Sequence, residues 1–412
     1  MNIKYCIIAS AILLYICFSL HGITYKCSSS VDIQNALDAA SPGDTIIINT
    51  GTYVGTLRSI NSKGCHFGSI QPGTASEPIT IKSANSSNMA VLSGSDVASA
   101  YVFYIFNADY WIIQDLMFTG AQKGIVLDQS SNTRIINCKV YGIGMEGIHL
   151  RDGSSNCSVE TCSISDTGLN TPGYGEGVYV GTDKGSWDTY APACYDNIIT
   201  NTVFGPNITA EHLDIKEGTR RTIVEYCEFN GTGITGENSA TTYVSCKGVD
   251  AIVRYNTGYR NGNTIIDSAF SCNNRGVEDS GTGNWFYYNT VYNDDSEAWV
   301  VRTKQGTCTY IVWSNTRIPE GNMYQAYSGS SYTEVDPGGT ETPVPTAVFI
   351  LGDANGDTSV DIIDALITAQ YYVGLNPANF SLQAADVNSD NVVNIIDALL
   401  IAQYYVGLIS EF

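Results

Sequence analysis

The segment Ile136-Asn-Cys-Lys-Val140 returns with changed letters as Val159-Glu-Thr-Cys-Ser-Ile164 and as Val224-Glu-Tyr-Cys-Glu-Phe229. Related β-rich segments recur along residues 113–318, most of them 22 to 26 residues apart, with Gly, Asn and Ser turns between them. A period in this range is typical of a solenoid, in which each repeat is one turn that buries its apolar face on its neighbours. The sequence therefore predicts an all-β coil of parallel strands.

Aligning the turns predicts two adjacent columns of stacked residues. The first contains Leu116, Cys138, Cys162, Thr202, Cys227, Thr257, Thr290 and Thr316. The column before it contains Asp115, Asn137, Thr161, Asn201, Tyr226, Asn256, Asn289 and Asn315. Stacked Asn amides can hydrogen-bond along the axis of a coil. The cysteines are interpreted as small buried packing residues rather than as disulfides or nucleophiles.

A second short strand follows within each turn, as in Gly147-Ile-His-Leu-Arg-Asp152 and Glu211-His-Leu-Asp-Ile-Lys216. Alternation predicts that the apolar residues of these strands point inward. The outward positions are then His149 and Arg151, Tyr179 and Gly181, Asp214 and Lys216, Ser245 and Lys247, with Arg302 further along. Because neighbouring coils lie about 4.8 Å apart, Lys216 and Lys247 are expected side by side on an open outer face, close to Asp214. The alternative is that these charges are simply solvated.

The first coil is preceded by a predicted capping helix at 33–40, and it opens at Pro42-Gly-Asp-Thr-Ile-Ile-Ile48. With Gly73-Thr-Ala-Ser-Glu-Pro-Ile-Thr-Ile81, this opening resembles that of right-handed parallel β-helix proteins of the pectate-lyase superfamily. Within it, the likeness is closest to the chondroitinase-B and alginate-lyase group. The resemblance implies β-elimination of a uronate, for which a cation neutralises the carboxylate and a base removes the C5 proton.

In that group the base is a Lys five residues after a calcium-binding acid, and Glu211 and Lys216 have this spacing. Two departures weaken the match. A second acid of the group falls on Thr209, and its catalytic Arg-His falls on Glu237-Asn238. Either Lys247 or Arg302 therefore substitutes for the missing cation, or the chain is not an enzyme of that group. The catalytic candidates are Lys216, Lys247 and Arg302, and the candidate ligands of a calcium ion in the groove are Glu211 and Asp214.

Further side chains are candidates for lining the same groove. His149, Arg151 and Tyr179 are predicted to bind substrate, and Glu176 is placed beside them. The insertion at 168–197 carries Trp187 and Tyr190, and Trp187 is predicted to stack on sugar. For His149, Tyr179 and Glu176 the solvated-surface alternative remains open, and the insertion's rings have the alternative of merely covering a coil.

The C-terminal residues contain one twelve-residue loop twice, Asp353-Ala-Asn-Gly-Asp-Thr-Ser-Val-Asp-Ile-Ile-Asp364 and Asp386-Val-Asn-Ser-Asp-Asn-Val-Val-Asn-Ile-Ile-Asp397. Oxygen-bearing side chains stand at positions 1, 3, 5, 9 and 12 of each, which is the EF-hand arrangement for calcium. Similar apolar segments follow at 365–375 and 398–408, and their spacing predicts a short helix after each loop.

This pair resembles the type I dockerin, a module that binds the cohesin domain of a scaffold protein. The resemblance implies two calcium ions. Their ligands would be Asp353, Asn355, Asp357, Ser359, Asp361 and Asp364 in one loop and Asp386, Asn388, Asp390, Val392, Asn394 and Asp397 in the other, with Ser359 and Val392 using their carbonyls. It also implies that loop positions 10 and 11 choose the cohesin. These are Ile362, Ile363, Ile395 and Ile396, and the duplication implies two related binding faces.

The beginning of the chain predicts export from the cell. Residues 7–20 form an apolar run typical of a secretory signal. The net charge is −21, of which the eight acids of 349–412, a segment without Lys or Arg, supply −8 and the rest −13. This argues against nucleic acid and anionic membranes as partners. The predicted organisation is a signal peptide at 1–24, a parallel β-helix at 28–325, a flexible linker at 326–347 and an all-α dockerin at 348–412.

Three hypotheses follow for function. The first is a secreted, scaffold-docked polysaccharide lyase that cleaves an acidic polysaccharide by β-elimination. The second is a non-catalytic β-helix that binds carbohydrate or spaces other modules. The third is a glycoside hydrolase or a uronate epimerase on the same fold.

Overall fold

The structure is a computed structural model. It describes residues 22–327, 329–335, 351–355, 359–373, 375, 377, 380, 382–388, 393–409 and 412. The predicted signal segment through residue 21, most of the predicted linker, and the predicted ligands Asp357, Asp390 and Val392 lie outside these residues. Within the described ranges, no helix is long and apolar enough to cross a membrane.

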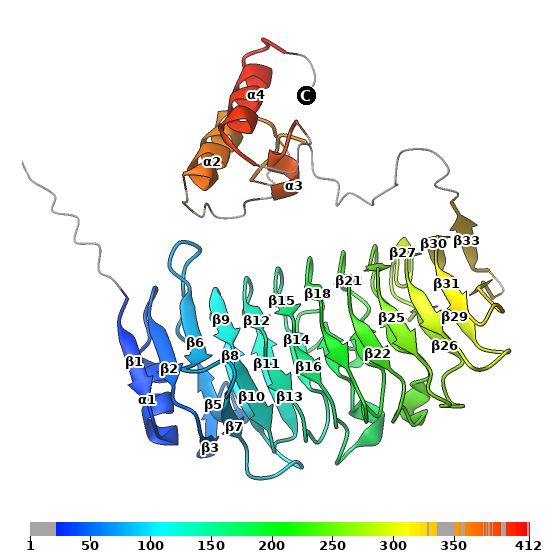
Figure 1. Ribbon diagram of the computed structural model, residues 1–412, viewed down its shortest axis with the longest axis horizontal. Coiled ribbons are helices and arrows are strands. Elements are labelled where there is room, and N and C mark those ends of the chain that lie inside the picture. The colour runs from blue at the N-terminus through cyan, green and yellow to red at the C-terminus, as the bar shows by residue number, and fades with distance from the viewer. Residues whose placement is uncertain are drawn as a thin grey trace, which may run out of the picture.

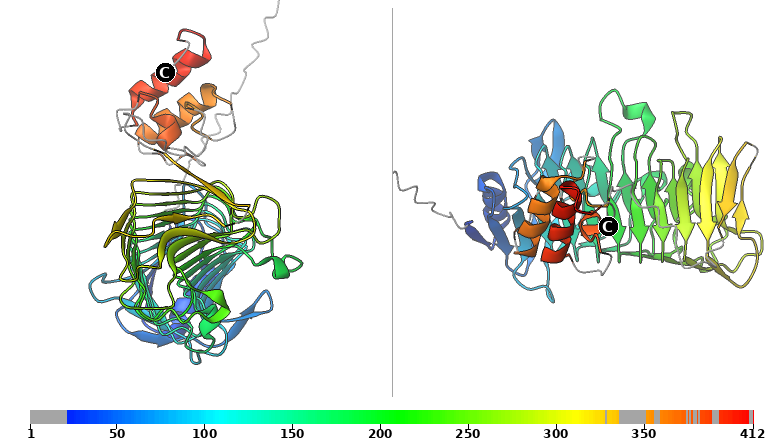
Figure 2. Two further views of the ribbon diagram at one scale, coloured as in Figure 1. Left: turned by 90° about the vertical axis from the view of Figure 1, so that its right-hand side faces the viewer. Right: turned by 90° about the horizontal axis from the view of Figure 1, so that it is seen from above.

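Residues 24–334 form a coil whose turns are stacked side by side along one axis (Figure 1). Seen along that axis, the strands enclose a single core (Figure 2). Three sheets build the walls, and all their strand pairs are parallel except β4 with β5. The prediction of a parallel solenoid is confirmed.

Each turn contributes about one strand to each sheet. Sheet A contains, in spatial order, β1 (Thr24–Cys27), β2 (Thr45–Ile48), β6 (Ile79–Ser83), β9 (Trp111–Gln114), β12 (Arg134–Ile136), β15 (Ser158–Glu160), β18 (Ile198–Thr200), β21 (Ile223–Glu225), β24 (Ile252–Arg254), β27 (Asn284–Tyr287), β30 (Thr309–Trp313) and β33 (Ser331–Glu334). Sheet B contains β3 (Thr52–Val54), β7 (Ala90–Ser93), β10 (Leu116–Thr119), β13 (Lys139–Val140), β16 (Ser163–Ile164), β19 (Val203–Phe204), β22 (Glu228–Asn230), β25 (Thr257–Tyr259), β28 (Thr290–Tyr292) and β31 (Thr316–Ile318). Sheet C contains β4 (Arg58–Ile60), β5 (Lys63–Ser69), β8 (Tyr101–Phe106), β11 (Lys123–Asp128), β14 (Ile148–Arg151), β17 (Val178–Val180), β20 (Leu213–Ile215), β23 (Val244–Cys246), β26 (Ser268–Asn273), β29 (Trp299–Gln305) and β32 (Tyr324–Gln325).

Sheet C has the register that the sequence predicts. His149 pairs with Tyr179, Tyr179 with Asp214, and Asp214 with Ser245. The alternate residues of the same strands, such as Leu213 and Val244, are fully buried in the core. The polar column therefore lies on the outer face of sheet C.

The aligned columns are correct as far as Cys227 and then slip by one residue. Glu228 pairs with Thr257, so Asn256 stands beside Cys227. Asn256, Asn289 and Asn315 form the inner ladder, with amide contacts of 3.0 and 2.9 Å between neighbours. The residue that precedes each member of this inner column has a positive φ. Tyr226, Tyr255 and Ser314 are examples. The ten described cysteines are buried and unpaired, consistent with packing residues.

The two ends of the coil differ from the prediction in their bounds. Helix α1 spans Ser30–Ala39 and begins earlier than expected because the Ser29 hydroxyl accepts the N–H of Asp32 as an N-cap. At the other end, β33 pairs with β30. The sheet thus continues beyond residue 325, where we expected the linker to begin.

The C-terminal region is helical, with α2 (Ile362–Tyr372), α3 (Leu382–Ala385) and α4 (Ile395–Tyr405). Helices α2 and α4 begin three residues before the predicted starts, because Asp361 and Asn394 act as N-caps in capping boxes with Asp364 and Asp397. The same loop side chains thus close the loop and start the helix.

Candidate functional site

Three glutamates occupy the same position on successive turns, just before β14, β17 and β20. The backbone N–H of Gly147 donates to the carbonyl of Glu176 at 2.9 Å, and that of Gly177 to the carbonyl of Glu211 at 3.2 Å. This ladder stacks Glu146, Glu176 and Glu211, and all three are buried. Sequence reasoning missed Glu146. The sequence signal that could have revealed Glu146 is an acid that recurs just before the sheet C strand of each turn, as in Glu146-Gly-Ile and Glu176-Gly-Val.

Asp214 joins the two lysines that the sequence predicts as neighbours. Its Oδ2 atom lies 2.6 Å from Lys247 Nζ and 3.5 Å from Lys216 Nζ. The expectation of an open face is wrong, since Asp214 is 2% exposed and Lys216 5%. Charges at this depth are retained only when they are paired, which this trio achieves.

The insertion at 168–197 covers these charges. Asp183, which caps the short helix η2 (Lys184–Ser186), lies 3.1 Å from Lys216 Nζ. The N–H of Lys184 donates to Glu217 at 3.0 Å, and this bond attaches the insertion to the turn that contains Lys216. On the opposite side, Asn238 Nδ2 donates to the carbonyl of Gly173 at 3.1 Å, and this contact joins η1 (Pro172–Tyr174) to η3 (Glu237–Ser239). The outer face of sheet C thereby becomes a groove with two walls.

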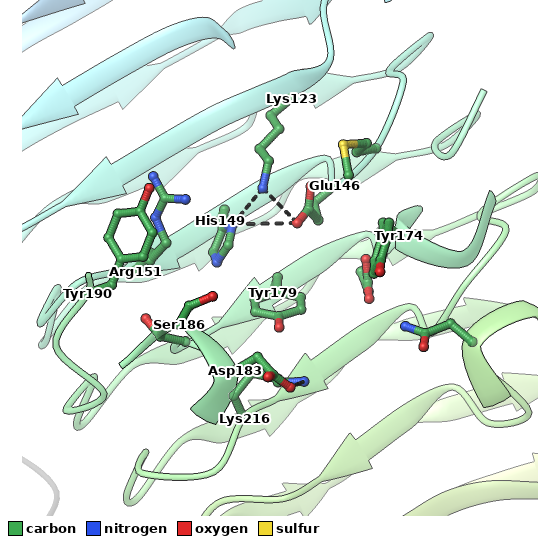
Figure 3. A pocket seen from close by; sticks show the side chains of 14 residues that line it. Lys123, Glu146, His149, Arg151, Tyr174, Tyr179, Asp183, Ser186, Tyr190 and Lys216 are labelled. Atoms are coloured by element: carbon green, nitrogen blue, oxygen red, sulfur yellow. Dashed lines mark hydrogen bonds and ion pairs between the residues drawn. The ribbon is translucent and has the colours of Figure 1, made fainter. Parts of the chain in front are cut away.

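The first cleft of this groove has a volume of about 380 Å³ (Figure 3). Its lining residues include His149, Arg151, Tyr179, Asp183, Tyr190 and Lys216. Lys216 Nζ lies 5.1 Å from the ring centre of Tyr179. Burial raises the pKa of the Tyr179 phenol well above its usual range, against the lowering effect of Lys216. The cleft therefore places a protonated phenol beside the Lys216 side chain.

His149 is held as a neutral ring by its two partners. Its Nε2 lies 3.1 Å from the carbonyl of Gly181, which can only accept, so Nε2 carries the proton. Its Nδ1 then accepts from Lys123 Nζ at 3.3 Å, and Lys123 also bonds Glu146 at 2.7 Å. Burial and then the charge of Lys123 lower the pKa of His149 well below its usual value. The ring packs against Tyr179 at a centroid distance of 4.4 Å, so it positions the phenol.

Arg151 is committed to a carboxylate of the neighbouring turn. Its Nε and Nη2 donate to both oxygens of Asp128 at 2.8 and 2.6 Å, and Asp128 also accepts from the Tyr104 hydroxyl. The ring of Tyr190 lies over the guanidinium at 3.9 Å. Arg151 thus lines the cleft as predicted, and it also supports the Tyr190 ring.

Three acids in the groove lie close enough together to bind one cation. Ligand atoms of Glu176, Glu211 and Asp214 all lie within 4.8 Å of one another. Glu176 Oε2 and Asp214 Oδ1 are buried and have no hydrogen-bond partner. Calcium takes carboxylate oxygens at 2.3–2.6 Å, so three oxygens on one ion fit this spacing. Glu211 and Asp214 were predicted as ligands, and Glu176 joins them.

Electrostatics distinguishes these acids. Burial raises the pKa of Glu176 well above its usual range, and the charges of Glu146 and Glu211 add to the effect. Burial also raises the pKa of Glu211, with a contribution from Asp214. For Asp214 burial acts in the same direction, but Lys216 and Lys247 outweigh it and lower the pKa. Asp214 is therefore the firmly ionised member.

A second cleft, of about 360 Å³, continues the groove beyond Asn238, which lines both clefts. Its lining includes Glu211, Ser245, Lys247, Ser271, Asn273, Arg275 and Lys304. Lys247 lines this second cleft, and its ammonium group lies 2.6 Å from Asp214. Sequence reasoning missed Arg275 and Lys304, because neither stands in the predicted strand columns.

Two predicted site residues lie away from both clefts. Trp187 is absent from their linings, and its indole N–H donates to the carbonyl of Thr182 at 2.9 Å, which braces the loop. Arg302 is also absent from the linings, and it pairs with Asp267 at 3.2 Å. Tyr190 takes the place in the first cleft that we expected for Trp187, and Lys304 is the cation of β29 that reaches the second cleft.

In the C-terminal region, the four predicted isoleucines lie on one surface. Ile362 and Ile363 of α2 face Ile395 and Ile396 of α4 across an apolar groove of about 540 Å³, and they are about half exposed. Both repeats contribute residues to this one groove, and the expectation of two related binding faces stays a prediction. Asp364 is fully buried and accepts the N–H groups of Asn355 and Asp361 at 3.0 and 2.8 Å. Asp397 repeats this with Asn388 and Asn394 at 3.4 and 2.9 Å. The described part of each loop is therefore wrapped around its last acid, as a calcium loop requires.

Two family descriptions match the sequence. Residues 23–177 match the Pel9A-like right-handed β-helix region, and residues 351–405 match the dockerin type I domain. No curated protein matches the chain.

Among solved structures, the alginate lyase from Paenibacillus sp. str. FPU-7 is 44% identical, with a TM-score of 0.70, over 74% of this chain and 99% of that one. Pectate lyase Pel9A is 15% identical, with a TM-score of 0.52, over 84% and 80% of the two chains. A rhamnogalacturonan lyase is 15% identical, with a TM-score of 0.56, over 81% and 92%. The last two likenesses show the shared fold. The chain therefore belongs to the right-handed parallel β-helix family that includes the Paenibacillus alginate lyase, and it ends in a type I dockerin domain.

Proposed function

We propose that this protein is a polysaccharide lyase that cleaves an alginate-type polyuronate by β-elimination. The observation that carries the proposal is the convergence of Tyr179 and Lys216 on the first cleft. It is supported by the likeness to an alginate lyase over almost all of that protein's length. The substrate class follows from that relative and from the cations along the groove.

Lys216 and Tyr179 divide the proton transfers. The Lys216 amine takes the C5 proton of the uronate, the electron pair forms the C4–C5 double bond, and the bond from C4 to the glycosidic oxygen breaks. Tyr179 Oη gives its proton to the leaving oxygen. This assignment uses the raised pKa of Tyr179, which keeps its proton available at neutral pH.

The resting state of Lys216 sets a condition on this mechanism. Burial disfavours its ammonium form, but Asp214, Tyr179, Glu217 and Asp183 outweigh burial and raise the pKa. Lys216 must therefore lose its proton before it can act as the base. Lys247, which shares the Asp214 carboxylate, holds that carboxylate in place when Lys216 becomes neutral.

The carboxylate of the reacting sugar requires positive charge beside it. Lys247 lines the second cleft beside Asp214 and supplies one such charge. Glu176, Glu211 and Asp214 would hold a calcium ion, which when bound would supply further positive charge to the substrate carboxylate. Arg302, predicted for this role, is instead paired with Asp267.

The test is a panel of polymannuronate, polyguluronate, pectate and a glycosaminoglycan, followed by ultraviolet absorbance of the new double bond. We expect absorbance to grow with the alginate polymers. No gain on any member would contradict the proposal and favour a carbohydrate-binding role. Reducing ends without absorbance would favour a hydrolase, and a changed ratio of the uronates without cleavage would favour an epimerase.

We further propose that the dockerin binds a cohesin of an extracellular scaffold through the groove formed by Ile362, Ile363, Ile395 and Ile396, with one calcium ion in each loop. An exposed apolar groove of this kind fits a protein partner. Cohesin binding measured with calcium and with chelator tests the proposal. Undiminished binding in chelator would contradict it.

A further inference from the structure

Some hydrogen-bond donors that line the second cleft have no acceptor among the residues that the structure describes around them. Asn273 Nδ2 donates to Ser245 Oγ at 2.9 Å and to Ser271 Oγ at 3.3 Å. Both hydroxyls are thus occupied as acceptors, and among the described residues no hydrogen bond uses their protons. Both serines are at most 1% exposed. Both serines line the second cleft, so their protons are available to a ligand bound there.

Arg275 brings an incompletely paired cation to the same place. Its nearest carboxylates, Asp183 and Glu217, are both 3.7 Å away, which is longer than a hydrogen-bonded ion pair. Its Nε is buried and has no hydrogen-bond partner. By contrast, Lys247 and Lys304 hold carboxylates at 2.6 and 2.9 Å. Arg275 is therefore the lining cation with donors to spare.

Resting on the proposed function, we propose that the second cleft is a subsite for the carboxylate of a second uronate, next along the chain from the sugar that reacts at Lys216. Arg275 and the hydroxyls of Ser245 and Ser271 bind this carboxylate. Buried donors without acceptors are costly, and an anion supplies several acceptor positions at once. The two clefts share Asn238, so one polymer can occupy both.

The proposal predicts a difference between a charged and a neutral sugar. The probes are an alginate tetrasaccharide and its carboxyl-reduced, neutral counterpart, with calorimetric binding to the full chain in a K216R background that prevents turnover. We expect Arg275→Gln to weaken binding of the acidic probe about tenfold, or ~1.4 kcal/mol, and to leave binding of the neutral probe unchanged. Arg134→Gln is the matched control, because Arg134 forms a bidentate pair with Glu160 on sheet A, outside both clefts.

Ser271→Ala provides a second test that keeps every ion pair. We expect it to weaken binding of the acidic probe several-fold, with only a small loss of melting temperature because Asn273 Nδ2 keeps Ser245 Oγ as its acceptor. Equal losses for both probes, or no loss in either variant, would overturn the subsite. If wild-type protein cleaves alginate and both variants bind normally, the subsite is wrong and the lyase stands. If nothing is cleaved but the acidic probe binds in an Arg275-dependent way, the lyase is wrong and the subsite stands.

Discussion

Replacing Asn289 by Ala tests the inner amide ladder of the coil. The Asn289 side chain accepts from the backbone N–H and from Nδ2 of Asn256, both at 3.0 Å. It donates to the carbonyl of Val253 and to Asn315 Oδ1, both at 2.9 Å. After truncation, Asn256 Nδ2 keeps the carbonyl of Val224, and Asn315 Oδ1 keeps the backbone N–H of Asn289. The backbone N–H of Asn256 is left buried without its partner.

The expected cost lies between two limits. One orphaned buried donor costs about 1–3 kcal/mol, and four lost hydrogen bonds at about 1 kcal/mol each sum to ~4 kcal/mol. We therefore expect Asn289→Ala to lower the free energy of unfolding by about 3 kcal/mol, measured from urea transitions followed by circular dichroism. Asn88→Ala is the control, because Asn88 is exposed and only its backbone carbonyl and N–H take part in hydrogen bonds; it should change stability by at most about 0.5 kcal/mol. Equal effects of the two substitutions would refute the reasoning.

Four other outcomes follow from the site and the dockerin. Lys216→Arg keeps a cation but removes a base that can be deprotonated, so we expect kcat to fall by about 10²–10⁴-fold with the melting temperature unchanged; near-normal kcat would show that Lys216 acts only as a charge. Tyr179→Phe should also lower kcat by at least about 10²-fold with little change in KM, and a change in KM alone would assign the phenol to binding. Because its neighbours raise the pKa of Lys216, the free amine becomes more abundant as pH rises, so kcat/KM of chelator-treated enzyme should increase from neutral to alkaline pH; a profile that falls over this range would exclude Lys216 as the base. Ile363→Asp together with Ile396→Asp should abolish cohesin binding in a pull-down while lyase activity stays constant, and retained binding would place the cohesin on another surface.

Periodicity in the sequence predicted the coil because each turn repeats the same inward pattern. His149, Tyr179 and Asp214 fell in one outward column for that reason, and the register agrees. The alignment slipped at Asn256, because Asn takes the positive-φ position at Asn137 and Asn201 but the inner position at Asn256, where Tyr255 has the positive φ. Stacking between Tyr226 and Tyr255, at 5.1 Å, accompanies this change. An alignment that matches residue types pairs Asn with Asn, and it therefore fails where Asn moves to a different position of the turn.

The burial of the site was beyond the sequence pattern because it depends on loops. Alternation says which face of sheet C carries Asp214 and Lys216, but not that the loop bearing Asp183 returns to cover them. Trp187 was predicted to stack on sugar, whereas the loop turns its indole toward the loop's own backbone. Contacts between an insertion and a distant turn leave no periodic signal.

The arrangement of charge explains how so acidic a protein can present a site for a polyanion. Of the net charge of −21, the C-terminal segment at 349–412 carries −8. Within the groove, Asp214 is 2% exposed and binds both Lys216 and Lys247, which come from successive turns. Asp214 therefore acts as the shared counterion that fixes the two ammonium groups beside the clefts. Because the two lysines come from adjacent turns and share one carboxylate, changing the length of either turn would separate them, which ties the chemistry of the groove to the regular stacking of the coil.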